Sequence, residues 1–581
     1  MPQTLVSLLH ARLARSPEAV GLLEKSPSGQ WEGTTWKAFA ERATRVAHAL
    51  TRHGVRPGAR VGIIASNGID WEVAQFGALM AGTCVVGLDE HYPDAQLNRL
   101  ARACGLDALF VATRASCDRL EPDLISGLRQ LICLREEAPA GLPNATSLAS
   151  LETASMDQVL PDVKPDTPAI IVFSSGTTGE PKLVQYTHGQ IMLAAEGIVG
   201  AFGEIPEQCA LLCWLPLANL FQRMINYCAM ERGACTHLLP DPRKVMDAVR
   251  ETRPYLLIGV PRFFERVYRG VNERIDKGPM LARAIARWAI ATGVRHRSDG
   301  RTGSLSLKLA DHLVLRKLRA VFGGEVRFLV SGSAPVPAGL HEFYDAIGLP
   351  IHEAYGVSEC VVPIAMNRPG QRRPGTVGRP LPQSEVKLSG EGEVLVRGTG
   401  VFGGYLGQAP GPGTAPDPEG YWHTGDLGVL EDGYLRLNGR KADVFKLSTG
   451  RWVSPALVEG ALLGVPSLDH AVVVGAGRKA GVAIVACSGV PADEQGRRDF
   501  GRQLGEAVAQ AAAGLPDYQR PAGLLVLDRP FSIGDGELTT NLKVRRKVIE
   551  AKLSARIESL YDQLDRTPPR AGEPSTLVVF A

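Results

Sequence analysis

The sequence has no uninterrupted apolar stretch of about 18 residues, which is the length that a membrane-spanning helix needs. Residues 1–20 also have no long apolar core. They have the pattern of an amphipathic helix, so we expect no signal peptide. The formal net charge of +3 is too small to indicate a nucleic-acid partner. The sequence therefore predicts a globular protein without a transmembrane segment, and it leaves peripheral membrane contact open.

Cysteine motifs are absent as well. The ten cysteines contain no C-x-x-C pair. The one local group, Cys209, Cys213 and Cys235 with His237, does not have the usual spacing of zinc ligands. We expect free thiols, mostly buried, in a protein of the reducing cytoplasm.

The length and pattern of the chain indicate several domains. A chain of 581 residues exceeds one ordinary hydrophobic core. Residues 60–89 read as strand, helix and strand, a pattern that recurs around 108–114. Residues 279–322 are helical in pattern and rich in arginine and lysine, and 407–420 read as a surface loop. A second series of strands and helices follows, and we place a domain boundary near 438–442.

The segment "IIVFSSGTTGEPKLVQYTH", residues 170–188, combines a strand with a polar loop. Ala169–Phe173 is a continuous apolar run, typical of a buried parallel strand. Glycines, hydroxyls and Lys182 follow, and such donors suit phosphate oxygens. The spacing matches neither G-x-x-x-x-G-K-[ST] nor G-x-G-x-x-G. Taken alone, the segment fits a flexible surface loop as well as a phosphate-binding loop.

Four later segments have the same character, with small residues and one or two polar groups after an apolar run. They are SGSAPVP (331–337), HEAYGVSE (352–359), GYWHTGDLG (420–428) and GRKADVFKLSTGRWVSP (439–455). In this order after the hydroxyl-rich loop, they resemble the motifs of the adenylate-forming superfamily, which includes acyl-CoA synthetases, luciferases and peptide-synthetase adenylation domains. The resemblance covers residues 22–561 and is closest to the long-chain acyl-CoA synthetases. The arginine-rich helical segment, residues 367–382 and residues 538–561 are further features of that branch.

The resemblance implies an α/β fold (α+β overall) with two domains. Residues 1–439 would form a large AMP-binding and acyl-binding domain of packed β-sheets and helices. Residues 440–565 would form a smaller, mobile α+β domain that carries the adenylation lysine, and 566–581 would be a tail. The implied reaction uses ATP, Mg²⁺ and coenzyme A. A fatty or other carboxylic acid becomes acyl-AMP with release of pyrophosphate, and the acyl group then passes to the CoA thiol.

The resemblance also implies the roles of individual residues. The phosphate loop would comprise Ser174, Ser175, Gly176, Thr177, Thr178, Gly179 and Lys182. The adenine slot and its surroundings would comprise Ser333, Ala334, Pro335, Glu353, Ala354, Tyr355, Gly356 and Ser358, with Ser358 kept as a phosphate contact. The remaining assignments are Asp426 for the ribose hydroxyls, Arg440 for ribose and phosphate, Gly450 in the loop that favours CoA, Glu359 with Ser174 for Mg²⁺, and Lys543 for the charge at the α-phosphate.

Several positions depart from the family pattern. Asn219, expected beside the acyl carboxylate, replaces a histidine, and Gln222 replaces a common glutamate. Ala442 stands at the hinge, where lysine or aspartate is usual, and Leu183 replaces a frequent glycine. Two alternatives therefore stay open. The acyl group could be loaded onto the phosphopantetheine of a carrier protein, or the chain could be a nucleotide-binding protein with weakened turnover. The sequence does not indicate the acyl chain length.

Overall fold

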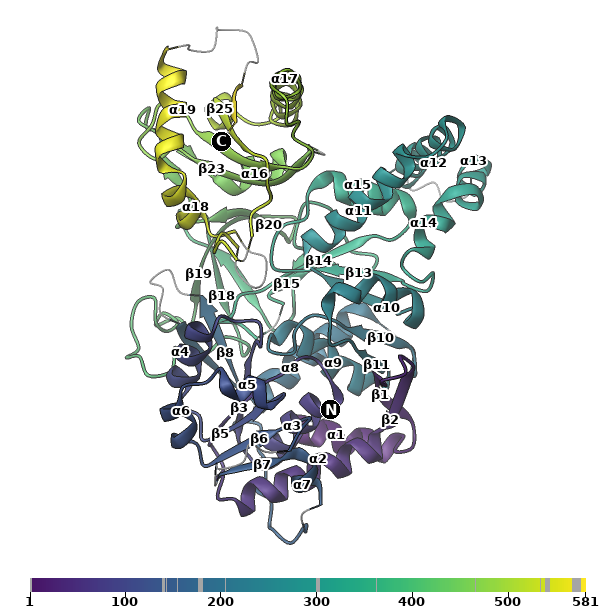
Figure 1. Ribbon diagram of the computed structural model, residues 1–581, viewed down its shortest axis with the longest axis vertical. Helices are drawn as coiled ribbons and strands as arrows, with labels where there is room; N and C mark the ends of the chain where they lie inside the picture. Colours follow the sequence, from purple (N-terminus) through teal and green to yellow (C-terminus); the bar gives the residue numbers. More distant parts are fainter. Residues whose placement is uncertain are drawn as a thin grey trace.

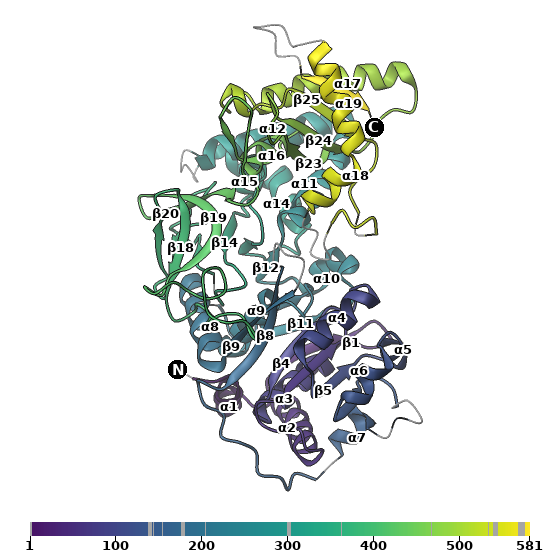
Figure 2. The ribbon, with the colours of Figure 1, turned by 90° about the vertical axis from the view of Figure 1, so that its left-hand side faces the viewer.

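The computed structural model describes residues 3–137, 142, 144–153, 155–175, 181–203, 205–298, 304–361, 363–465, 467–532, 534–538, 544–566 and 576–580. It shows a large N-terminal domain below a smaller C-terminal domain, and this arrangement is visible in two perpendicular views (Figure 1, Figure 2). The mixed α/β fold with a large and a small domain is therefore confirmed.

One sheet of the large domain has seven strands in the order β7-β6-β5-β3-β4-β8-β9. All neighbours are parallel except β8 and β9, which are antiparallel. The parallel strands read as continuous apolar runs because both faces of the sheet are covered. The bounds are β3 Arg60–Ile64, β4 Cys84–Leu88, β5 Ala108–Val111, β6 Gln130–Cys133, β7 Ala145–Ser147, β8 Pro168–Ser175 and β9 Pro181–Thr187.

Helices connect and cover this sheet. The expected strand–helix–strand unit over residues 60–89 is confirmed, because α3 links the parallel neighbours β3 and β4. The first helix, α1, begins after Thr4, whose hydroxyl accepts from Ser7 N–H, and it buries three leucines. The bounds are α1 Leu5–Arg15, α2 Trp36–Arg52, α3 Ile69–Met80, α4 Asp94–Cys104, α5 Arg114–Asp118, α6 Pro122–Gly127 and α7 Leu148–Glu152.

A second sheet has nine strands in the order β16-β15-β14-β13-β12-β10-β11-β1-β2. Its central strands are parallel, so their carboxyl ends lie at one edge. The bounds are β1 Val20–Lys25, β2 Trp31–Thr35, β10 Ala210–Cys213, β11 Cys235–Leu238, β12 Leu256–Gly259, β13 Phe328–Ser331, β14 Ile351–Tyr355, β15 Ala365–Met366 and β16 Arg379–Pro380. Helices α8 His188–Phe202, α9 Leu220–Arg232 and α10 Val245–Thr252 belong to this part, with a short 3₁₀ helix Pro242–Lys244.

The arginine-rich segment is mostly helical, as expected, in the part that the structure describes. It contains α12 Met280–Ser298, α13 Leu305–Ala310, a π-helical turn Asp311–Leu315 and α14 Arg316–Ala320. The flanking helices are α11 Pro261–Asp276 and α15 Ala338–Ile347. Helices α12 and α13 project at the upper right of Figure 1.

A four-stranded antiparallel sheet, β17-β18-β19-β20, ends the large domain. Its strands are β17 Glu385–Leu388, β18 Glu393–Arg397, β19 Trp422–Glu431 and β20 Tyr434–Arg440. Residues 407–420 contain neither helix nor strand, which confirms the expected loop.

The C-terminal domain has its own cores on the two faces of the sheet β23-β24-β25-β26. Its elements are β21 Phe445–Lys446, β22 Trp452–Val453, α16 Pro455–Leu462, β23 Leu468–Val474, β24 Val482–Cys487, α17 Glu494–Ala511, a 3₁₀ helix Asp517–Gln519, β25 Gly523–Leu527, α18 Arg546–Lys552, α19 Ser554–Arg566 and β26 Leu577–Phe580.

Among the described residues, no helix is long and apolar enough to cross a membrane. All ten cysteines are free thiols, and eight of them are buried. Burial raises the pKa of the Cys209 thiol to about 11. The described part of the chain brings together no three His, Cys, Asp or Glu side chains that could hold a metal ion.

Candidate functional site

The carboxylate of Glu359 lies beside Ser174, near the end of β8. Ser174 Oγ donates to Glu359 Oε1 at 2.5 Å, and the hydroxyl of Tyr405 donates to the same oxygen at 2.6 Å. Glu359 is buried and follows β14, so this contact joins the ends of strands from both large sheets. Two donors on one oxygen fix the carboxylate and leave Oε2 without a described partner.

Lys182 belongs to the same group. Its Nζ lies 4.6 Å from the centre of the Tyr405 ring, a cation–π contact. Burial, followed by the bond to Glu359, raises the pKa of Tyr405, so the phenol stays a donor at neutral pH. We call Ser174, Lys182, Glu359 and Tyr405 the phosphate-side cluster, after the role that we propose for it below. The Lys182 ammonium thus lies over the ring of the same residue whose hydroxyl binds the Glu359 carboxylate.

A second group lies on β14, β19 and β20, and we call it the ribose-side cluster after the role that we propose for it below. The hydroxyl of Tyr355, at the end of β14, donates to Asp426 Oδ2 at 2.7 Å. Asp426 Oδ1 lies 3.1 Å from Arg440 Nε, and the two residues are paired across β19 and β20. Tyr355 and Asp426 are buried, whereas the Arg440 side chain is half-exposed. Burial, and then the Asp426 charge, raise the pKa of Tyr355 well above its usual range.

A further loop follows β13, a strand that pairs with β14. Ser333 has φ +77°, a left-handed conformation that is uncommon for a residue with a side chain, and Ala334 and Pro335 are exposed. A buried carboxylate underneath holds the loop: Glu353 Oε1 accepts from Val336 N–H at 2.9 Å, and its Oε2 lies 2.9 Å from His341 Nε2. Both oxygens of the Glu353 carboxylate are therefore used in buried contacts that hold the exposed loop in place.

The other predicted positions are more scattered. Ala354 lies in β14, and Gly356 and Ser358 follow it. Ser358 Oγ reaches the Phe173 carbonyl only at 3.5 Å. Gly450 has φ +82° in the turn between β21 and β22, and Ala442 lies in the turn after β20. Gly176, Thr177, Thr178, Gly179 and Lys543 lie outside the described residues, as does the side chain of Ser175.

Asn219 is the N-cap residue of α9, and the same helix contributes to a buried polar network. Glu72 Oε1 accepts from Asn226 Nδ2 at 2.7 Å, and Gln222 Nε2 donates to Asn226 Oδ1 at 3.1 Å. Burial raises the pKa of Glu72, with Asn226 and then Arg223 acting in the opposite direction. The network holds α9 against α3, and sequence reasoning missed it because its partners are far apart in the chain.

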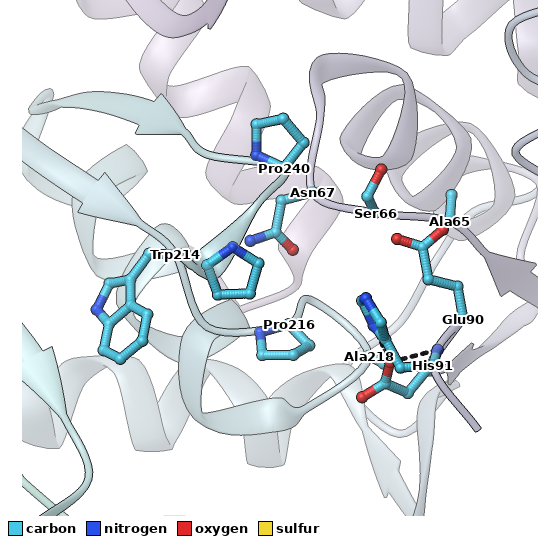
Figure 3. A pocket seen from close by; sticks show the side chains of 11 residues that line it. Ala65, Ser66, Asn67, Glu90, His91, Trp214, Pro216, Ala218 and Pro240 are labelled. Atoms are coloured by element: carbon cyan, nitrogen blue, oxygen red, sulfur yellow. Dashed lines mark hydrogen bonds and ion pairs between the residues drawn. The ribbon is translucent and has the colours of Figure 1, made fainter. Parts of the chain in front are cut away.

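A small cavity lies nearby, at the carboxyl ends of β3, β4, β10 and β11. Figure 3 shows Asn67 between the prolines of this cavity, with Glu90 and His91 on its other side. Asn67 Nδ2 donates to the Leu215 carbonyl at 2.9 Å, and Asn67 Oδ1 accepts from Leu217 N–H at 2.9 Å. The volume of about 20 Å³ suits a single water molecule. Asn67 thus fixes the loop that carries Asn219.

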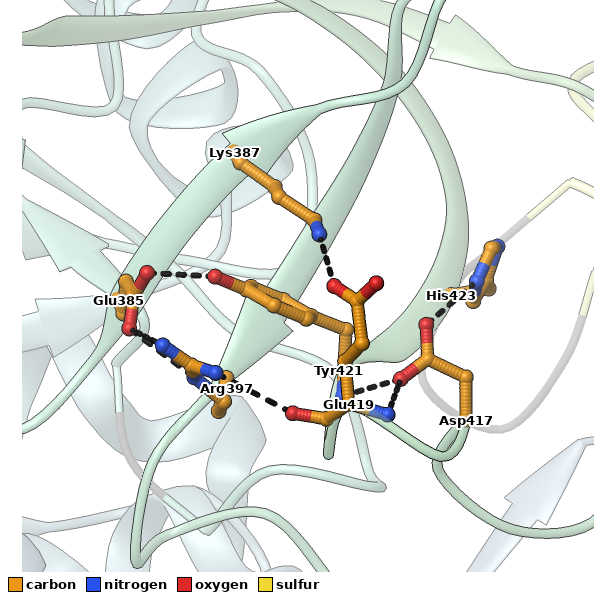
Figure 4. A network of polar contacts seen from close by, with 7 residues as sticks. All are labelled: Glu385, Lys387, Arg397, Asp417, Glu419, Tyr421 and His423. Carbon is orange, nitrogen blue, oxygen red and sulfur yellow. Dashed lines mark hydrogen bonds and ion pairs between the residues drawn. The ribbon is translucent and has the colours of Figure 1, made fainter.

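A surface network around Tyr421 lies at the start of β19 (Figure 4). The Tyr421 hydroxyl donates to Glu385 Oε1 at 2.5 Å, and Lys387 Nζ and the Arg397 guanidinium lie over its ring at 3.7 and 4.6 Å. Asp417 accepts from Tyr421 N–H at 2.8 Å, which ties the 407–420 loop to the strand. The network stabilises the strand that carries Asp426 and does not belong to either cluster.

Sequence reasoning also missed Tyr405 and Tyr421. Tyr405 follows two glycines in a stretch without regular periodicity, so only its tertiary contacts with Glu359 and Lys182 mark it as part of the site.

The chain matches known protein families over most of its length. Residues 9–406 match the AMP-binding enzyme family, and residues 442–565 match the AMP-binding enzyme C-terminal domain. The long-chain-fatty-acid–CoA ligase FadD15 of Mycobacterium bovis is 29% identical over 92% of this chain and 93% of its own. Human long-chain-fatty-acid–CoA ligase 1 is 26% identical over 93% of this chain and 84% of its own.

Solved structures share the fold. The anthranilate CoA ligase AuaEII in complex with anthranoyl-AMP has a TM-score of 0.73 at 20% identity, covering 96% of this chain and 99% of its own. The A-PCP didomain of carboxylic acid reductase from Segniliparus rugosus in complex with AMP has a TM-score of 0.75 at 19% identity, covering 98% and 83%. The fold and the two family matches define a two-domain adenylate-forming protein. The chain belongs to the AMP-binding enzyme family.

Proposed function

We propose that the protein activates a fatty acid with ATP to acyl-AMP, releases pyrophosphate, and transfers the acyl group to the thiol of coenzyme A. Long-chain acids are the proposed substrates because full-length relatives carry that name. The observation that carries the proposal is the adjacency of the two clusters. Residues 355–359 supply both Tyr355 of the ribose-side cluster and Glu359 of the phosphate-side cluster.

The ribose-side cluster suits a nucleoside. Asp426 is fixed by Tyr355 and Arg440, and a carboxylate can accept two ribose O–H bonds. The exposed loop Ser333–Pro335 would face the base, held from below by Glu353. Arg440 has a half-exposed guanidinium and would reach ribose or phosphate from the hinge.

The phosphate-side cluster suits a metal–phosphate group. Mg²⁺ prefers one or two carboxylates together with phosphate oxygens and water, and Glu359 with the Ser174 hydroxyl is such a donor set. When bound, Mg²⁺ would neutralise charge on the triphosphate. Lys182 adds a positive charge beside the loop, and its contact with the Tyr405 ring holds it near Glu359. Residues 174–179 would hold the departing pyrophosphate.

Lys543 would stabilise the negative charge that develops at the α-phosphate while the carboxylate attacks. Asn219 would lie beside the acyl carboxylate, on the loop fixed by Asn67. Gly450 lies in a tight turn of the C-terminal domain, where backbone without a side chain could lie beside the acceptor thiol.

The alternative function differs in the molecule that accepts the acyl group. One structural neighbour is an adenylation domain joined to a carrier-protein domain, so loading of a phosphopantetheine arm is the alternative. We favour CoA because the full-length relatives are named CoA ligases.

The test is a pyrophosphate-release assay with Mg²⁺, ATP and a panel of carboxylic acids of increasing chain length. We expect pyrophosphate and acyl-AMP with medium or long acids, and acyl-CoA with free AMP after CoA is added. Formation of ADP and phosphate would refute activation at the α-phosphate. Acyl-AMP that persists with CoA and disappears with a holo carrier protein would assign the alternative acceptor.

A further inference from the structure

The helices α12, α13 and α14, with the π-helical turn between the last two, are called the helical arm. The arm already packs on the large domain with one face. Ala289 and Leu315 are fully buried, and a Cβ at Gly293 would lie 2.4 Å from the Ala346 carbonyl oxygen of α15. One face of the arm is therefore already used in packing on the large domain.

The outward face is unusually apolar. Six of the thirteen exposed large apolar side chains among the described residues lie on this arm. Leu305, Leu309 and Leu313 are 84%, 52% and 40% exposed, and Met280 and Leu281 at the start of α12 are 78% and 73% exposed. The three leucines recur every fourth residue, so they form one stripe along α13 and the π-helical turn. Exposed leucines concentrated in this way mark an interaction surface.

The same arm is strongly basic. Residues 280–320 contain nine arginines and lysines and two aspartates, a formal charge of +7, whereas the whole chain carries only +3. The rest of the protein is therefore net acidic. Lys308, Arg316 and Lys317 are exposed and form no ion pair with any residue that the structure describes. They lie three or four positions from a leucine of the stripe and therefore border it.

We propose that the helical arm docks on an anionic lipid bilayer, with the stripe Leu305–Leu309–Leu313 inserted at the interface and Lys308, Arg316 and Lys317 at the headgroup phosphates. Helices that lie in the plane of a membrane combine an apolar face with lysine and arginine in this manner. Charge complementarity selects an anionic surface, and it disfavours a symmetric contact with a second copy, which would bring another arm of charge +7 against the first. The arm also projects from the body, so it can reach a flat surface (Figure 1).

The experiment is co-sedimentation of the full chain with vesicles of phosphatidylcholine alone or mixed with phosphatidylglycerol. We expect binding to the mixed vesicles that weakens as salt is added. Each neutralised lysine or arginine should reduce partitioning by about fivefold. The triple variant Leu305→Ser, Leu309→Ser, Leu313→Ser should bind at least about tenfold more weakly, since burying even one leucine contributes about that factor.

Matched controls separate insertion from general effects. Val159 and Leu430 are exposed apolar residues outside the arm, so Val159→Ser with Leu430→Ser should bind like the parent. The triple variant should keep the parent's thermal unfolding midpoint, because its changed side chains are solvent-exposed. If it does not fold, Lys308→Gln with Lys317→Gln tests the same surface through its charges.

Three results would overturn the proposal. One is equal binding of parent and variants to anionic vesicles, and another is equal binding of the parent to neutral and anionic vesicles. The third is a concentration-dependent dimer of the parent that the triple variant abolishes, which would assign the stripe to self-association. None of these readouts depends on acyl activation, so their outcome is independent of the proposed function.

Discussion

Replacing Tyr405 with phenylalanine tests whether the orientation of Glu359 matters for the site. The change removes one of the two hydrogen bonds to Glu359 Oε1, the bond of 2.6 Å, and leaves the Ser174 bond of 2.5 Å. A hydrogen bond to a charged group contributes about 1.5–3 kcal/mol, and Glu359 is buried, so little water can replace it. We expect kcat/KM for pyrophosphate release to fall roughly 10- to 100-fold, measured at several Mg²⁺ concentrations.

A double-mutant cycle with Glu359→Gln shows whether the effect runs through the carboxylate. If Tyr405 acts by holding Glu359, then Tyr405→Phe should change little in the Glu359→Gln background. The matched control is Tyr421→Phe, which also removes a tyrosine–glutamate bond, of 2.5 Å to Glu385, but in the surface network. That variant should retain activity. Effects of Tyr405→Phe and Glu359→Gln that add within about 0.5 kcal/mol would refute the reasoning.

Three further predictions concern the C-terminal domain. Lys543→Ala should slow adenylation by about 10²–10³ while preserving thioester formation from pre-made acyl-AMP; equal loss in both half-reactions would contradict this division. Burial, with Arg262 and Arg269 nearby, lowers the pKa of His470 to about 3, so below about pH 6.5 the unfolded chain takes up a proton that the folded chain refuses. The free energy of unfolding should then decrease by up to about 1.4 kcal/mol for each unit by which the pH falls below about 6.5. The denaturation midpoint of His470→Gln should depend less steeply on pH. Arg269→Ala removes the ion pair with Asp469 between α11 and β23, and small-angle scattering should show a wider range of domain orientations; an unchanged profile would show that the pair does not hold the domains.

Local pattern predicted those parts of the fold whose partners are near in sequence. The unit over residues 60–89 and the strand after Ala169 were predictable because both faces of their sheet are covered and the strands read as apolar runs. The nine-stranded sheet was not predictable, because Leu22 in β1 pairs with Thr236 in β11. No local periodicity specifies a pairing over such a distance.

The candidate site divides in the same way. Ser174, Glu359 and Asp426 lie in motifs that can be read from the sequence, and the structure brings each of them to a defined cluster. Tyr405 is connected to Glu359 only through folding, since no repeated pattern surrounds it. The motif residues mark the chemistry, whereas the residues that orient them emerge from tertiary contacts.

The departure at Gln222 has a physical explanation in the buried network. Its amide accepts from Leu215 N–H at 3.2 Å and donates to Asn226 Oδ1, while Asn226 donates to Glu72. A glutamate at position 222 would lose the donor that faces Asn226 Oδ1 and would add a second carboxylate beside Glu72. With Glu72 present, the neutral amide is the side chain that satisfies every partner here, because a buried polar group without a partner costs about 1–3 kcal/mol. Gln222 is thus matched to its neighbours, and its presence is no argument for lost turnover. The question of weakened turnover then rests on Asn219, whose replacement by histidine in the pyrophosphate assay addresses it directly.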